Sequence, residues 1–280
     1  MKKIGFIDYY ISEWHANNYP AWIKQACEDL NADYKLCYAW AEKDISDVDG
    51  KSTDEWCAEH GVERCDTIAE LCEKSDAIMI LAPSNPEKHW AYIQEVFPFG
   101  KRTYVDKTFA PDAKTAADIF ALAEKYNTPF FSTSALRYGD GLEKFIGAKE
   151  VYVKGGGGNF EEYCIHQFEI LVKLIGLGAE KVYAEQQGDD MVVRIAYPDD
   201  RKSEIRFFSN YGYMFTAKTA DGTVTEYEVP AGYFPNLAHR VIRFFEDGTV
   251  DFPGEQTMEI MKLREAAIKA TKAPKTWISL

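Results

Sequence analysis

The sequence has no stretch that approaches the roughly 20 apolar residues of a membrane-spanning helix. Its N-terminus carries a basic pair, Lys2 and Lys3, but the apolar run that follows stops at Asp8, too early for the core of a signal peptide. We therefore interpret the first residues as a buried strand, and we expect a cytoplasmic location and no membrane partner.

Positive charge is also scarce. The 280 residues include 45 Asp and Glu but only 32 Lys and Arg, for a formal net charge of −13, and the basic residues are not gathered into a stripe. A polyanion would be repelled by this surface, so nucleic acid is not expected as a partner.

Cysteine pairs of the CxxC type are missing. The six cysteines lie mostly inside periodic segments, and we interpret them as buried free thiols rather than disulfides or zinc ligands. His15, His60 and His239 stand at no spacing typical of a metal site, so no metal is expected.

The first half of the chain alternates short apolar runs with amphipathic stretches. Lys3–Ile7 and Tyr34–Ala39 are predicted strands, and Ala16–Leu30 between them has apolar residues at helical spacing. Asp76–Ala82 is a nearly unbroken apolar run, typical of a parallel strand buried on both faces. This alternation predicts a Rossmann-like, doubly wound parallel sheet over residues 1–133.

Beyond about Lys149 the pattern changes to an alternation of apolar and polar residues with period two, as in antiparallel strands with one wet face. Turn residues such as Asp221-Gly222 separate these segments, and one helix, Glu161–Ile175, interrupts them. Residues 134–280 are therefore predicted to form an α+β domain with an open, mainly antiparallel sheet. The C-terminal helix could pack back against the first domain.

Two groups of residues stand in a characteristic order. A buried strand leads into Ala82-Pro83-Ser84-Asn85, His89 follows, and the next strand ends in Val105-Asp106-Lys107-Thr108. In the second half, four consecutive glycines, Gly155 to Gly158, precede Glu162, His166 and Glu169. In order, spacing and chemical type, these residues resemble the motifs of the glucose–fructose oxidoreductase, inositol dehydrogenase and MocA family. The family has Glu-Lys-Pro around the lysine and Asp at both acidic positions beside the histidine.

The resemblance implies an oxidoreductase that acts on a sugar, polyol or related hydroxylated small molecule with NAD or NADP. It implies that His166 is the catalytic base, that Lys107 polarises the reacting oxygen, and that Glu162 binds or orients the substrate. The predicted cofactor-binding residues are Asp8, Tyr9, Tyr10, Ile11, Pro83, Asn85, His89 and Lys107, and the predicted substrate-binding residues are Arg137, Glu162 and Glu169.

The spacing of the second group also has a physical basis. Glu162, His166 and Glu169 fall at i, i+4 and i+7 on one face of a helix, where a carboxylate can orient an imidazole and raise its basicity. Structural alternatives stay open at this point: a solvated helix face for this trio, a loop-stabilising role for His89, and a salt bridge for Arg137.

The glycine-rich turn that lets a pyrophosphate approach the first helix is absent. The first strand is followed instead by Asp8-Tyr9-Tyr10-Ile11-Ser12 and then Glu13, and two carboxylates there would repel a phosphate. The second strand, expected to end at Trp40, brings no acid for a ribose.

Two hypotheses follow. The first is an NAD(P)-dependent oxidoreductase with an altered turn. The second is a relative without dinucleotide binding, which serves as a carbohydrate-binding or regulatory subunit or catalyses a redox-neutral step.

Aromatic residues are dense in the predicted antiparallel sheet. If they lie on its open face, they favour a homodimer or homotetramer formed through that sheet. Packing beneath the C-terminal helices is the competing explanation. The residues concerned are Phe207, Phe208, Tyr211, Tyr213 and Phe215.

Overall fold

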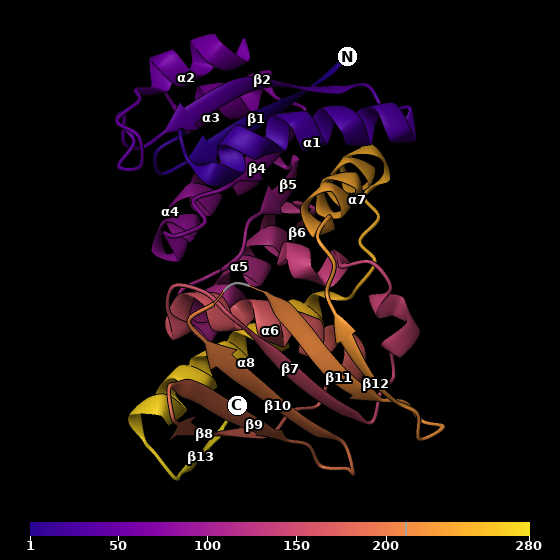
Figure 1. Ribbon diagram of the computed structural model, residues 1–280. Coiled ribbons are helices and arrows are strands. Elements are labelled where there is room, and N and C mark those ends of the chain that lie inside the picture. The colour runs from indigo at the N-terminus through magenta and orange to yellow at the C-terminus, as the bar shows by residue number, and fades with distance from the viewer. Residues whose placement is uncertain (211) are drawn as a thin grey trace. The chain divides into compact units, whose positions relative to one another are not determined.

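The computed structural model describes residues 1–210 and 212–280, and the chain divides into two compact units (Figure 1). Unit 1 comprises Met1–Thr133 and Phe234–Asp251, and unit 2 comprises Ser134–Tyr233 and Phe252–Leu280. Within the described residues, no helix is both long and apolar enough to cross a membrane.

Unit 1 is built on a six-stranded sheet in the order β3-β2-β1-β4-β5-β6, in which every neighbouring pair is parallel. This is the strand order of a doubly wound, dinucleotide-binding type of sheet, so the predicted class is confirmed. Its elements are β1 (Lys2–Asp8), α1 (Trp14–Leu30), β2 (Tyr34–Ala41), α2 (Thr53–His60), β3 (Glu63–Arg64), α3 (Ile68–Lys74), β4 (Ala77–Ile80), α4 (Pro86–Val96), the 3-10 turn η1 (Phe97–Phe99), β5 (Arg102–Val105), α5 (Ala113–Tyr126), β6 (Phe130–Ser132) and α7 (Tyr233–Asp247).

The local sequence explains these elements. All four residues of β4 are buried, because β4 lies between β1 and β5 in the middle of the sheet. In α1 the buried residues Ala16, Tyr19, Ile23 and Ala26 recur at helical spacing, which gives the helix one apolar face against the sheet.

Helix α7 belongs to unit 1 although its sequence lies in the second half of the chain. Its Phe244 ring lies 5.0 Å from that of Phe131 in β6, and the Phe245 carbonyl accepts hydrogen bonds from Tyr34 and Arg102. The helix therefore completes the core beside β2, β5 and β6.

Unit 2 is a seven-stranded sheet in the order β12-β11-β7-β10-β9-β8-β13. All its pairs are antiparallel except β7 with β10, so the prediction of a mainly antiparallel sheet is also confirmed. Helices α6 and α8 pack on the sheet and on each other. The elements of this unit are the 3-10 turns η2 (Ala135–Tyr138) and η3 (Leu142–Phe145), β7 (Glu150–Gly156), α6 (Phe160–Ile175), β8 (Lys181–Gln187), β9 (Asp190–Ala196), β10 (Lys202–Phe208), β11 (Tyr213–Lys218), β12 (Val224–Glu228), α8 (Gly254–Lys272) and β13 (Trp277–Ser279).

The aromatic residues of this sheet do not form an open apolar face, and that expectation is wrong. Phe207, Tyr213 and Phe215 are buried, and the Phe207 ring packs edge-on against Phe160 of α6. Phe208 is half-buried, and Tyr211 lies outside the described residues. Because side chains alternate along a strand, the opposite face carries charged residues instead, including Glu185, Arg194 and Glu204, which form one ion-pair chain. Self-association through this sheet stays a prediction.

Candidate functional site

In unit 2 the glycine run shapes the surroundings of His166. A Cβ at Gly155 would come within 2.3 Å of the Tyr213 ring, and one at Gly157 within 2.3 Å of the Tyr163 ring. Only glycine lets the two rings lie so close to the strand end. The centroids of the same two rings lie 5.9 and 5.7 Å from that of the His166 imidazole, so the histidine has two aromatic neighbours.

Ser134 fixes the imidazole. Its hydroxyl oxygen lies 2.7 Å from Nδ1 of His166 and also accepts a hydrogen bond from the backbone amide of Leu136. Because Nδ1 is engaged in this way, any proton that the ring exchanges with a ligand passes through Nε2. A hydroxyl can donate or accept, so this partner is compatible with either tautomer of the ring.

Glu162 lies one turn before His166 at the start of α6. The helix is capped by Asn159, whose side-chain oxygen accepts from the backbone amide of Glu162 at 2.8 Å. The Asn159 amide group in turn donates to the Glu162 carboxylate at 3.1 Å. The half-buried carboxylate is thereby held at the N-terminus of α6, near the ring that it was predicted to orient.

Arg137 and Glu169 form an ion pair with each other. Both side chains are only 4% exposed, and the guanidinium also donates to Gln256 at 2.7 Å and lies over the ring of Phe252. The second oxygen of Glu169 accepts from the backbone amide of Ser134 at 3.2 Å. These contacts favour the structural alternative for the pair, which supports Ser134 and, through it, His166. Their predicted contact with a substrate stays a prediction.

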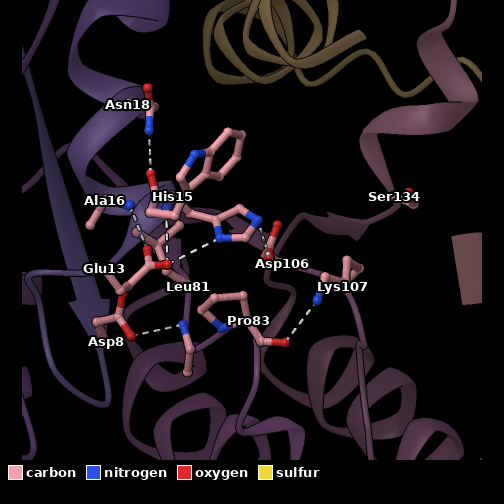
Figure 2. Close-up of polar contacts among 12 residues, drawn as sticks. Asp8, Glu13, His15, Ala16, Asn18, Leu81, Pro83, Asp106, Lys107 and Ser134 are labelled. Carbon is pink, nitrogen blue, oxygen red and sulfur yellow. Dashed lines mark hydrogen bonds and ion pairs between the residues drawn. The ribbon is translucent and has the colours of Figure 1, made fainter. Parts of the chain in front are cut away.

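In unit 1, Lys107 follows the end of β5. Its side chain is buried and its ammonium donates to the carbonyl of Pro83 at 3.0 Å, which ties it to the end of β4 (Figure 2). The Lys107 ammonium therefore lies at the carboxyl ends of the parallel strands, as the sequence predicts.

Asn85 is the N-cap residue of α4, and its side-chain amide donates to Glu87 at 3.2 Å.

His89 is completely buried. Its Nε2 lies 2.7 Å from the carbonyl of Leu81 and its Nδ1 lies 3.2 Å from that of Phe109, and burial lowers the pKa of the imidazole. A buried ring whose two nitrogens lie against carbonyls of two loops is the arrangement expected of the structural alternative. Its predicted contact with a cofactor stays a prediction.

The end of β1 is occupied by the protein's own carboxylates (Figure 2). Glu13, the N-cap of α1, accepts hydrogen bonds from the backbone amides of His15 at 2.8 Å and Ala16 at 2.5 Å. Asp8 accepts from the amide of its neighbour Tyr9 at 2.7 Å and from that of Ala82 at 3.1 Å.

Comparison with known proteins gives matches in structure alone: no family model and no curated protein matches the sequence. A probable dehydrogenase from Thermotoga maritima is 14% identical to this chain at a TM-score of 0.78. The alignment covers 99% of this chain and 98% of that protein. GenD2 of gentamicin A biosynthesis, solved in complex with NAD, is 11% identical at 0.79, with 100% and 97% covered. The apo scyllo-inositol dehydrogenase of Lactobacillus casei is 13% identical at 0.77, with 100% and 98% covered.

The chain has the fold of the glucose–fructose oxidoreductase, inositol dehydrogenase and MocA family. In a Rossmann-type unit, the pyrophosphate of a dinucleotide lies on the free amides at the N-terminus of the helix that follows β1. In this chain those amides already donate to Glu13, and Asp8 occupies the start of the turn. The residues at the end of β1 therefore do not fit a pyrophosphate group.

Two residues beside the predicted sites were missed from the sequence. Ser134 is 32 positions from His166, and no local pattern links a serine to a distant imidazole. Glu42 follows β2, which runs to Ala41 and not to Trp40, so the strand does end beside an acid. Its carboxylate pairs with Lys88 and accepts from the Tyr92 hydroxyl at 2.7 Å. A predicted end of this strand one or two residues later would have identified Glu42 as the acid that follows it.

Proposed function

We propose that the chain binds a sugar, polyol or related hydroxylated small molecule at His166 and that the imidazole exchanges a proton with a ligand hydroxyl in a redox-neutral step. The observation that carries this proposal is the imidazole that contacts Ser134 and has the rings of Tyr163 and Tyr213 as neighbours. Aromatic faces suit the C–H surfaces of sugars and polyols, and a positioned imidazole suits their hydroxyl groups. The dehydrogenases among the structural neighbours, scyllo-inositol dehydrogenase included, support the substrate class.

The proton transfer needs only residues of unit 2. When Nδ1 carries the ring proton and donates to Ser134, Nε2 can accept a proton from a hydroxyl. The ring is then a cation with a proton on each nitrogen, and Nε2 can return its proton while Nδ1 continues to donate to Ser134. The same nitrogen therefore removes and restores the proton. The carboxylate of Glu162 favours the charged ring between these two events.

An NAD(P)-dependent oxidoreductase is the second candidate. It is favoured by the fold, since the similar structures include several dehydrogenases and one is bound to NAD. In that case Lys107, whose ammonium donates to the carbonyl of Pro83, would polarise the reacting oxygen, and this role stays a prediction. The altered turn at Asp8 to Ile11 places this candidate second.

Ligand titration of the full chain tests the proposal. A panel of polyols, aldoses and sugar acids is screened by isothermal titration calorimetry, and we expect at least one compound to bind wild type. The change His166→Ala should weaken that binding about tenfold or more, because a charged or strongly polar hydrogen bond is lost. His239→Ala is the matched control, because that imidazole is on α7 and pairs with Asp29. Equal loss in both variants, or no binding by any compound, would contradict the proposal.

A further inference from the structure

We infer that the carboxylates of Glu13 and Asp8 replace a phosphate group at the N-terminus of α1, so that unit 1 does not bind a dinucleotide there. The inference goes beyond the proposed function because it concerns unit 1 alone. Its outcome is independent of what His166 binds.

The first argument is the use of backbone donors. An anion site at a helix N-terminus depends on amides that point at the ligand and have no other acceptor. Glu13 takes two such amides in the first turn of α1, and its side chain is only 8% exposed. The same carboxylate lies 3.1 Å from Nδ1 of His15. A phosphate would have to displace a buried carboxylate with three partners.

The second argument is the anchoring of the turn. The Ser12 hydroxyl donates to Asp49 at 2.7 Å, and the carbonyl of Ser12 accepts from the Ser46 hydroxyl at 2.6 Å. The carbonyl of Tyr9 accepts from the amide of Lys43 at 2.7 Å. The turn is tied at both of its ends to residues 43–49, so an opening that would admit a ligand breaks several hydrogen bonds at once.

The third argument is charge. Asp106, 2% exposed at the end of β5, faces the same place, and its carboxylate lies 3.8 Å from Nε2 of His15. Each close like-charge pair weakens the binding of an anion about fivefold even at the dielectric constant of water. The two phosphate groups of a dinucleotide would be repelled by this cluster of carboxylates.

Titration of the full chain with NADH, NADPH and inorganic pyrophosphate, by calorimetry and by thermal melting, tests the inference. Three proteins are compared: wild type, Asp8→Gly/Glu13→Ser, and the control Asp112→Ser. The serine at position 13 can still cap α1. The control removes a capping carboxylate from another helix, α5, where Asp112 accepts from the amide of Thr115.

We expect wild type and the control to bind none of the three ligands at about 1 mM, and the double variant to gain about tenfold or more in affinity for pyrophosphate. If the double variant does not fold, Glu13→Ser alone is expected to show the gain. Wild-type binding of NADH or NADPH with a Kd below about 1 mM would overturn the inference. So would folded variants whose pyrophosphate affinity equals that of wild type, because the carboxylates would then not be what excludes the ligand.

Discussion

The two units treat their buried carboxylates in opposite ways. In unit 2, Glu169 faces the guanidinium of Arg137, and both of its oxygens have donors. In unit 1, Asp8 and Asp106 each keep one oxygen that is buried without a hydrogen-bond partner, and within the described residues neither pairs with a lysine or an arginine. A buried carboxylate that faces a cation is costly to remove, because its loss leaves the cation unpaired, whereas one that faces only neutral donors is costly to keep charged. The same residue type therefore predicts opposite effects of mutation in the two units.

The helix N-termini differ in the same sense. Helix α6 follows four glycines and begins on the neutral cap Asn159, and its first turn carries the acidic residues Glu161 and Glu162. Helix α1 follows two tyrosines and begins on Glu13. The family-like pattern is thus kept around His166 and replaced around Asp8.

The largest expected effect is in unit 2. Glu169→Ala should destabilise the chain by about 3–5 kcal/mol, because it leaves the Arg137 guanidinium buried without its anion. The free energy of unfolding is measured by urea titration. The control is Glu161→Ala, which removes a pair with Lys272 whose side chains are 57% and 68% exposed, and it should cost less than about 1 kcal/mol. Equal losses in the free energy of unfolding of the two variants would show that burial of the ion pair does not affect stability.

The opposite sign is expected at Asp8. Because its pKa is raised in the folded chain, this carboxyl group favours folding at low pH, and that contribution is lost as the pH rises through its raised pKa. Asp8→Asn keeps an acceptor for the amides of Tyr9 and Ala82 and removes the charge. We expect it to stabilise the chain by about 1 kcal/mol at about pH 8 and by less at about pH 5. Thermal melts over this pH range measure the difference, and a variant that is destabilised equally at every pH would contradict the comparison.

The smallest effect is expected at Ser134. Ser134→Ala removes the hydroxyl from Nδ1 of His166 and should change the tautomer populations of that ring while it lowers stability by only about 1 kcal/mol. The ¹⁵N chemical shifts of the imidazole nitrogens report the tautomer, and Ser134→Thr should restore the wild-type spectrum. If the shifts of His166 are the same in wild type and Ser134→Ala, Ser134 is not a positioning residue.

Much of the fold could be predicted from the sequence, because the information is local. The period of the apolar residues marks β4 as a buried strand and the segments after β7 as half-exposed ones. Helix α7 begins at Tyr233 although Pro235 follows two residues later, because proline is tolerated in the first turn of a helix. The apolar stripe of α7 predicts that the helix packs on another part of the protein. The stripe does not specify that this part is the core of unit 1.

The contacts that define the site are less predictable. Period two tells which residues of β10 and β11 share a face, and it does not tell which face the helices cover, so the sequence leaves open whether the aromatic residues lie on the open face or beneath helices. The partners of His166 and Arg137 come from segments about 30 residues away. Only the packing of η2 against α6 brings them together, and a single sequence contains no signal for it.

The placement of α7 has a consequence for biosynthesis. The first unit lacks one of its helices until the chain has been made as far as Asp251, and the segment between Ser134 and Tyr233 belongs to the other unit. A ribosome adds roughly 5–20 residues per second. After β2, β5 and β6 have been made, several seconds or more therefore pass before the face of α7 that carries Phe244 and Phe245 can cover them. During translation this apolar surface is open to chaperones. A fragment that stops at Thr133 would keep it open permanently.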